Sequence, residues 1–149
     1  MDNRRESITD HFLMAPPLQE ALVIRRTKGH VSTNVPHRYV HHSPTGYEYG
    51  YGGSGPADLA LNLAEAVILR EIPDVDTNQV ELWDGSTCSY EAWIIHHDLK
   101  FGLIAPLSQD TDYTIPYEDV EATVMSLIGD HQERIQEHHE TERFIREEL

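Results

Sequence analysis

The chain has one cysteine, two lysines and no long apolar run in its 149 residues. Cys88 alone cannot form an internal disulfide, which fits a reducing compartment. No stretch reaches 18 apolar residues, so no membrane-spanning helix is expected. The polar residues 1–6 are not followed by the apolar segment of a secretory signal. These absences predict a soluble protein that is cytoplasmic or virion-associated.

Basic residues are scarce as well, because 11 Lys and Arg face 26 Asp and Glu, for a net charge of −15 at pH 7. Such a surface repels a phosphate backbone, so nucleic acid is not an expected partner. Three explanations of the acidity stay open: adaptation to high salt, imitation of DNA in a basic groove, or an ordinary acidic surface. The lack of lysine beside plentiful acids favours a halophilic host.

Familiar enzyme motifs are missing around the glycine-rich run. No lysine follows Ser54 or Gly55, which excludes a P-loop, and Pro56 stands where a nucleophile elbow needs glycine. Residues 50–55 satisfy G-x-G-x-x-G, but the segment before them is Tyr-Glu-Tyr and not a buried aliphatic strand. We therefore assign no catalytic residue and no cofactor.

The ten histidines include three adjacent pairs, which point apart on strands and splay on helices. None of these pairs makes an H-x-x-x-H motif and no H-E-x-x-H occurs, so no metal site is expected. Cys88 with His96 or His97 is weak evidence for a thiol–imidazole pair, and an inert buried cysteine is favoured. The pairs are His41-His42, His96-His97 and His138-His139.

Ser43-Pro44-Thr45-Gly46 carries the residues of a type I turn, with Ser first, Pro second and Gly fourth. This turn predicts a hairpin between residues 38–42 and 47–51. Tyr47, Tyr49 and Tyr51 would then share one face of a strand, with packing as their role.

A largely buried helix is expected from Pro56 to about Arg70, with Gly55 as its cap. Only Asp58, Asn62 and Glu65 interrupt its apolar faces, and Asp58 would lie in the first turn, near the positive end of the helix dipole. Five glycines within ten residues precede it, which we interpret as geometry for the loop that passes over this helix.

Further elements follow from periodicity and turn residues. Short strands are expected at residues 22–24, 31–35, 80–83 and 113–115. A helix is expected at residues 90–103, buried along Tyr90, Trp93, Ile94, His97, Phe101 and Ile104. Another helix should begin at Pro116 and end before Gly129 as its C′ residue.

These elements predict an α+β fold, in which a small, mostly antiparallel sheet packs on a central buried helix and two further helices complete the core. The domain organisation is a polar arm at residues 1–20, one domain at 21–129, and a charged helix or tail at 130–149. The charged segment is too polar to form a core and is a candidate contact for a homo-oligomer.

Residues 43–61, which read S-P-T-G-Y-E-Y-G-Y-G-G-S-G-P-A-D-L-A-L, resemble a family of small uncharacterised proteins from phages, proviruses and other mobile elements. Residues 90–101 and 113–120 are loosely similar, with Lys100-Phe101 in reversed order. The resemblance covers about half of the chain. It implies a viral or mobile-element origin and an α+β domain, and it implies no activity.

We expect a non-enzymatic accessory protein of a virus or mobile element that acts through contacts with viral or host proteins, as a virion component or as a host-factor inhibitor. The alternative is a module for a small anion such as a nucleotide, bound at the N–H groups of a helix start. A hydrolase with scattered carboxylates and histidines is a third reading. The ligand residues of the alternative are Arg38, Gly50, Gly52, Gly53, Ser54 and Gly55, whereas Ser43, Pro44, Gly46, Tyr47, Tyr49, Tyr51 and Pro56 are structural.

Overall fold

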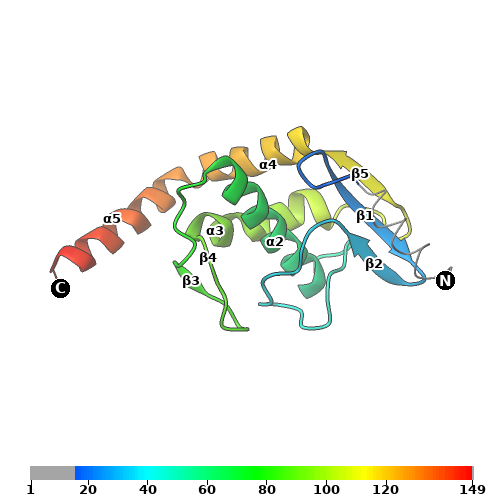
Figure 1. Ribbon diagram of the computed structural model, residues 1–149, viewed down its shortest axis with the longest axis horizontal. Helices are drawn as coiled ribbons and strands as arrows, with labels where there is room; N and C mark the ends of the chain where they lie inside the picture. Colours follow the sequence, from blue (N-terminus) through cyan, green and yellow to red (C-terminus); the bar gives the residue numbers. More distant parts are fainter. Residues whose placement is uncertain (1–15, 149) are drawn as a thin grey trace, which may run out of the picture.

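Three strands form an antiparallel sheet in the order β2-β1-β5. Strand β1 (Ala21–Thr27) lies between β2 (His30–Thr33) and β5 (Tyr113–Pro116), and a separate antiparallel pair joins β3 (Val80–Glu81) to β4 (Thr87–Cys88). Together with the helices, these strands give the computed structural model the expected α+β fold (Figure 1). It describes residues 16–148, so residues 1–15 of the expected arm and Leu149 lie outside the described residues.

The β1–β2 hairpin closes through Lys28 and Gly29, whose φ values are 51° and 83°. Thr27 pairs with His30, so the loop has two residues, and two positive φ values match the twist of the flanking strands. Gly29 adopts this conformation without strain. Lys28 is strained, because its backbone is in the left-handed region, where a β-carbon comes close to the following carbonyl oxygen. The expected strands at 22–24 and 31–35 are confirmed, although β2 ends at Thr33.

The expected hairpin between residues 38–42 and 47–51 is wrong, because neither segment is a strand. The turn between them does form, with the Gly46 N–H donating to the Ser43 carbonyl at 3.3 Å. Without a strand the tyrosines do not share a face: Tyr49 is fully buried and Tyr51 is 44% exposed. Strand β5 forms at the expected residues 113–115 and extends by one residue to Pro116. It pairs with the edge of β1 that β2 leaves free.

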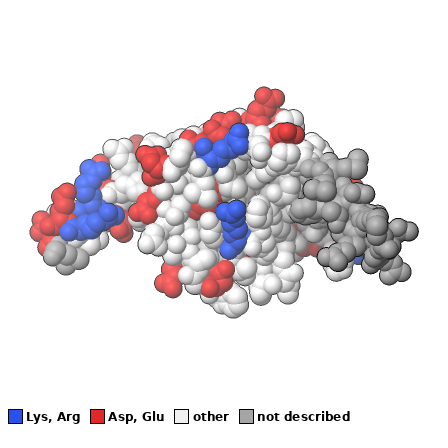
Figure 2. Space-filling view, in the orientation of Figure 1, with Lys and Arg blue, Asp and Glu red and all other residues white. Residues whose placement is uncertain are grey.

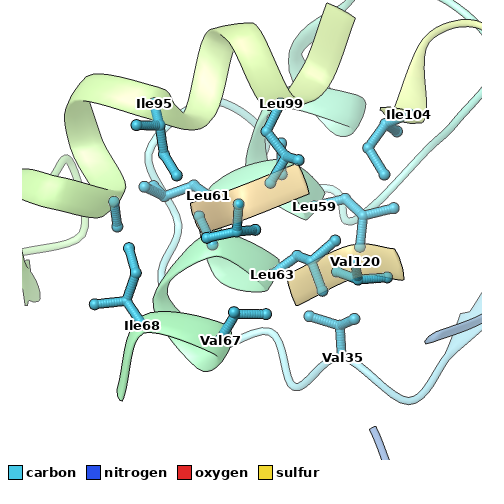
Figure 3. Packing of buried hydrophobic residues seen from close by; sticks show 14 of the residues in the cluster. Val35, Leu59, Leu61, Leu63, Val67, Ile68, Ile95, Leu99, Ile104 and Val120 are labelled. Atoms are coloured by element: carbon cyan, nitrogen blue, oxygen red, sulfur yellow. The ribbon is translucent and has the colours of Figure 1, made fainter. Parts of the chain in front are cut away.

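Helix α2 (Ser54–Glu71) runs through the centre of the core and is buried on nearly every side. It begins two residues earlier than expected: Gly53 is the N-cap, and Pro56 is the third helical residue. Proline is tolerated there because the first N–H groups of a helix have no acceptor within it. Figure 3 shows leucines of α2 in contact with aliphatic side chains of the neighbouring elements, among them Leu59, Leu61, Leu63, Ile95, Leu99 and Val120.

Helix α3 (Tyr90–Leu99) packs on α2 and continues into a π-helical turn, η1 (Lys100–Ile104). The expected helix is confirmed, but its expected buried side is wrong, because His97 and Phe101 are exposed and His96 is buried. Aliphatic residues three and four apart (Ala92, Ile95 and Leu99) face the core, and the aromatic side chains of α3 flank them.

Helix α4 (Tyr117–Asp130) follows β5 directly, and only His131 separates it from α5 (Gln132–Glu148). Gly129 lies inside α4 and lacks the positive φ of a C′ glycine, so the expected stop at this residue is wrong. The two helices run along one edge of the molecule, and α5 extends beyond the core to the C-terminal end (Figure 1). Its Ile135 is buried, whereas Phe144 and Ile145 are exposed.

Acidic residues are numerous along α4 and α5, and basic residues are sparse over the centre of the visible face (Figure 2). Within residues 16–148, no helix combines the length and the apolar character needed to cross a bilayer.

Candidate functional site

Three buried polar side chains of α2 hold the segments that surround this helix. Asp58, Asn62 and Glu65 are spaced four and three residues apart, so they lie on one face. Each is at most 2% exposed. Buried polar groups need partners, and here the partners are mainly backbone and hydroxyl groups of distant segments.

Residues 38–43, which we call the bridging loop, cross α2 on two of these side chains. The Asn62 Oδ1 accepts from the backbone N–H groups of Arg38 and Tyr39, both at 2.9 Å. The Asp58 carboxylate accepts from the N–H groups of three successive residues, His41, His42 and Ser43, at 2.9–3.4 Å. These bonds use the donors that a strand would need, which explains why residues 38–42 form no hairpin. Asp58 therefore stabilises the bridging loop, whereas from the sequence we expected it to interact with the positive end of the helix dipole.

Glu65 positions the start of α3. Its carboxylate accepts from the Ser89 N–H at 2.6 Å and from the Ser89 hydroxyl at 2.9 Å. Ser89 in turn caps α3, because its Oγ accepts from the Ala92 N–H at 3.1 Å. Burial raises the pKa of Glu65, the two bonds from Ser89 oppose this effect, and the nearby Glu91 raises the pKa further.

A hollow of about 590 Å³ lies beside the bridging loop, between the β1–β2 hairpin and α2. Its wall is mostly apolar, and from α2 it includes Ala66 and Leu69. We call it the arginine hollow. Its lining residues are Pro16, Pro17, Leu18, Gln19, Val23, Arg25, Ser32, Thr33, Asn34, Pro36, Arg38, Tyr39, Asn62, Ala66, Leu69 and Arg70.

The charge of this hollow is opposite to that of the whole chain. Its described lining holds Arg25, Arg38 and Arg70 and no acidic residue, although acids outnumber bases 26 to 11 overall. Arg70 lies 3.5 Å from the Glu71 carboxylate and over the Tyr117 ring. Among the described residues, no carboxylate lies within ion-pair distance of Arg25 or Arg38. The hollow is therefore suited to an anion with an apolar body.

The predicted ligand residues do not come together in one place. Arg38 lines the arginine hollow, whereas Ser54 and Gly55 line a smaller polar hollow of about 270 Å³ that contains Glu48. Arg26 pairs with this carboxylate at 2.6 Å, and its bond to Glu48 is the main reason that the pKa of Glu48 is lowered. An ionised Glu48 disfavours an anion at the start of α2.

The remaining glycines of the run serve close packing. A β-carbon on Gly50 would lie 2.8 Å from the Leu107 carbonyl oxygen, and Gly50 has a φ of 86°. A β-carbon on Gly53 would overlap the Tyr51 ring, and one on Gly52 would lie 3.1 Å from Phe101. Gly55 is equally tight, because its β-carbon would lie 2.9 Å from the Glu48 backbone nitrogen. The backbone therefore needs glycine at positions 50 and 55 whether or not a ligand binds, whereas Gly52 and Gly53 meet only the rings of the exposed Phe101 and Tyr51.

Two tyrosines of the run tie the loops together. The Tyr47 hydroxyl donates to the Pro36 carbonyl at 2.8 Å, and the Tyr49 hydroxyl donates to the Thr111 carbonyl at 3.0 Å. Ser43 adds its hydroxyl to the turn by donating to the Gly46 carbonyl at 2.8 Å. Pro44 occupies the turn.

Toward the other end of the bridging loop, His42 lies close to His96 and His97 of α3, and we call these three residues the histidine cluster. One ring nitrogen of each lies within 4.8 Å of those of the other two, an arrangement that could hold a metal ion. Burial lowers the pKa of His96 to about 3, although the Trp93 carbonyl opposes the shift. Burial also lowers the pKa of His42, against the opposing charge of Asp58, and that of His97, where the charge of Lys100 adds to the effect.

Sequence reasoning missed both groupings for one reason: each joins residues from separate segments. Spacing within an adjacent histidine pair carries no signal that His42 meets His96, which lies 54 residues away in sequence. Arg25 and Arg70 carry a weak signal, since Arg25 follows Val23 at strand spacing, and Arg70 lies at helical spacing from Ala66.

Residues 19–80 match the model of a family of unknown function, DUF6166. The matched segment contains residues 43–61, so the expected similarity to an uncharacterised domain family is confirmed, while its link to phages and mobile elements stays a prediction. The match includes most of the arginine hollow and His42, but not His96 or His97. Among the curated proteins and the solved structures, none matches the chain significantly.

Proposed function

We propose that this protein binds a small amphipathic anion in the arginine hollow. The observation that carries the proposal is a mostly apolar wall with three arginines and no acidic residue in its described lining, in a strongly acidic chain; of the three, Arg70 has the Glu71 carboxylate beside it. Pockets of this volume hold drug-sized ligands, and a few polar groups fix the ligand's orientation. From the sequence, an anion-binding site at the glycine run was the alternative function. We now propose the anion site beside Arg38, with Arg25 and Arg70 as its neighbours.

The ligand class follows from the wall and the charge together. Guanidinium groups bind carboxylates and phosphates through paired hydrogen bonds. The apolar surface from Val23, Ala66 and Leu69 adds favourable burial of an alkyl or aryl body. An alkyl carboxylate or alkyl phosphate satisfies both requirements, whereas a free phosphate satisfies one.

Calorimetric titration of the full chain tests the proposal with decanoate and decyl phosphate as probes, and with decanol and inorganic phosphate as controls. We expect saturable binding of the two amphipathic anions only. Arg25→Gln and Arg38→Gln should each weaken binding about tenfold or more, because a hydrogen bond to a charged group contributes roughly 1.5–3 kcal/mol. Comparing the two headgroups shows which one the guanidinium groups prefer.

Arg143→Gln is the matched control, because Arg143 lies on α5, away from the hollow lining, and the substitution removes the same charge. It should bind the probes as the unmodified chain does. Absence of binding by both anions, or equal weakening by all three substitutions, would remove the proposal.

A second function, action through protein contacts as a viral or mobile-element accessory protein, is favoured by α5. The proximal half of this helix docks through the buried Ile135 and through His138, which stacks on Tyr90. The distal half presents Phe144 and Ile145, which are 63% and 47% exposed. Exposed apolar side chains on a projecting helix support a protein partner or a second copy of the chain, in the host cytoplasm or in a virion.

Sedimentation of the chain with and without residues 140–149 tests this role for α5. Removing all of residues 130–149 would also remove the contacts of Ile135 and His138, so the shorter deletion is the cleaner one. Loss of an oligomer, or of binding to a copurified viral or host protein, supports the role. Unchanged mass and unchanged partner binding would exclude it.

A further inference from the structure

The histidine cluster has the geometry of an open three-ligand metal site. The Nε2 atoms of His42 and His96 lie 3.0 Å apart, and the ligand nitrogens of all three residues fall within 4.8 Å of one another. Ligand nitrogens around a tetrahedral Zn²⁺ lie about 3.3 Å apart, given Zn–N bonds of about 2.0–2.1 Å. Small side-chain rotations therefore suffice to place one ion between the three rings.

The hydrogen bonds of His96 leave a lone pair on its Nε2 for an ion. The Nδ1 of His96 lies 2.6 Å from the Trp93 carbonyl, which only accepts, so Nδ1 carries the proton. The Nε2 of the neutral His96 ring then has no proton, and the His42 Nε2–H donates to it. An ion bound here displaces the His42 proton, which moves to Nδ1 of the same neutral ring, and the Trp93 carbonyl orients His96 as outer partners do in metal sites.

Two of the α2 side chains hold the ligands in place before any ion arrives. Asp58 fixes the backbone of His42 through the bridging loop, and its carboxylate supplies a negative charge nearby. Glu65 fixes Ser89 and hence the start of α3, which carries the other two ligands. His41 is already used, because its Nδ1 accepts from the Trp83 N–H at 3.0 Å.

We propose that His42, His96 and His97 bind one divalent transition-metal ion, with Zn²⁺ as the principal candidate and a fourth position open to water or an anion. Three imidazoles suit Zn²⁺, and an open fourth position is typical of sites that bind or activate a small ligand. Lys100 lies close enough for its charge to act on His42 and His97. That ammonium weakens the ion's binding and favours an anion beside the ion.

The test uses the full chain without a polyhistidine tag, titrated with Zn²⁺ in a calorimeter and with Co²⁺ by visible absorption. We expect one equivalent of each ion and the absorption of tetrahedral Co²⁺, which Zn²⁺ abolishes. His42→Ala and His97→Ala should each weaken Zn²⁺ binding at least tenfold. Both residues are at least partly exposed, so these variants should fold even if a change at the buried His96 does not.

His30→Ala is the matched control, since it removes an exposed histidine of β2 and should leave affinity unchanged. Lys100→Met should tighten Zn²⁺ binding several-fold by removing the positive charge. The proposal fails if the unmodified chain binds less than one equivalent, if His42→Ala and His97→Ala bind Zn²⁺ as tightly as His30→Ala does, or if Lys100→Met binds it more weakly.

Discussion

The two ends of the bridging loop differ in charge and in the residues around them. Beside Arg38 lies a mostly apolar hollow with three guanidinium groups. On the side of His42 lies a tight cluster of imidazoles whose pKa values are lowered by burial, with the aromatic ring of Trp93 beside it. Both ends depend on adjacent turns of one helix, through Asn62 and Asp58. A single row of buried side chains thus supports two chemically different groups of residues.

The substitution Asp58→Ala should have the largest effect, because it leaves three successive backbone N–H groups without their acceptor. We expect a loss of about 3 kcal/mol or more in the free energy of unfolding, measured by urea denaturation. Zn²⁺ binding should weaken as the backbone of His42 becomes mobile. Asp110→Ala, at an exposed position, is the control and should change stability by less than about 0.5 kcal/mol. An equally small loss for Asp58→Ala would contradict the role of the carboxylate.

Asn62→Ala should affect the arginine hollow more than the histidine cluster. Its amide makes two bonds to the Arg38 and Tyr39 N–H groups and one to the Tyr39 carbonyl, so we expect a loss of about 2 kcal/mol. Decanoate affinity should fall more than Zn²⁺ affinity, because Asp58 still holds His42. Paired titrations of the same variant measure both. Equal losses of decanoate and Zn²⁺ affinity would show that the bridging loop moves as one unit.

Glu65→Gln tests the third side chain through pH. The folded-state pKa of Glu65 is raised above its ordinary 4.5 by burial, so its ionised form destabilises the fold. Stability of the unmodified chain should therefore fall as pH rises from about 4.5 through the raised pKa, and Glu65→Gln should lack this fall. The amide retains an acceptor for the Ser89 N–H and gains a donor for its hydroxyl.

Urea midpoints of Glu65→Gln and the unmodified chain, measured from pH 4 to pH 8, make the comparison. The urea midpoint of Glu65→Gln minus that of the unmodified chain should increase with pH and then become constant. A constant difference across this range would mean that the carboxyl does not titrate there. Glu65→Ala is the contrasting change, and it should be destabilising at every pH because Ser89 loses both acceptors.

The smallest expected effect concerns Cys88, which is fully buried beside Ser89. Burial, with the charge of Glu65 as a second cause, raises the pKa of its thiol to about 12. Alkylation by iodoacetamide at pH 8 should therefore be far slower in the folded chain than in urea, because the thiolate is the reactive form. Glu65→Gln should speed it slightly. Folded and unfolded chains reacting at the same rate would show that Cys88 is exposed.

Periodicity and turn chemistry were enough to predict most helices and strands. The apolar run after Pro56 predicts α2, the short β-prone runs predict β1 and β2, and Pro116 marks the junction of β5 and α4. These signals are local, since each depends on residues within one turn or one helical repeat. The same kind of signal predicted the wrong side for α3, because its aromatic residues and its aliphatic residues both fit a helical period.

The sites were harder to predict because side chains of α2 decide where the loops go. Asp58 and Asn62 appeared in the sequence as a polar interruption, yet they accept backbone N–H groups from 15 to 24 residues away. No local pattern distinguishes a solvent-facing Asn from one that fastens a distant loop. For the same reason, the hairpin predicted from the strand-like residues 38–42 does not form, because Asp58 and Asn62 bind the N–H groups that it would need. The contact between His42 and His96 was not predicted either.

The turn at Lys28 has a practical consequence for chemical labelling. Of the two lysines in the chain, Lys100 is buried, and Lys28 stands exposed at the tip of the first hairpin. An amine-reactive dye or cross-linker should thus modify one lysine side chain of the folded protein, at a place outside both the hollow and the imidazole group. A fluorophore attached there would report on rotation of the whole molecule and on proximity to a partner, without occupying either site.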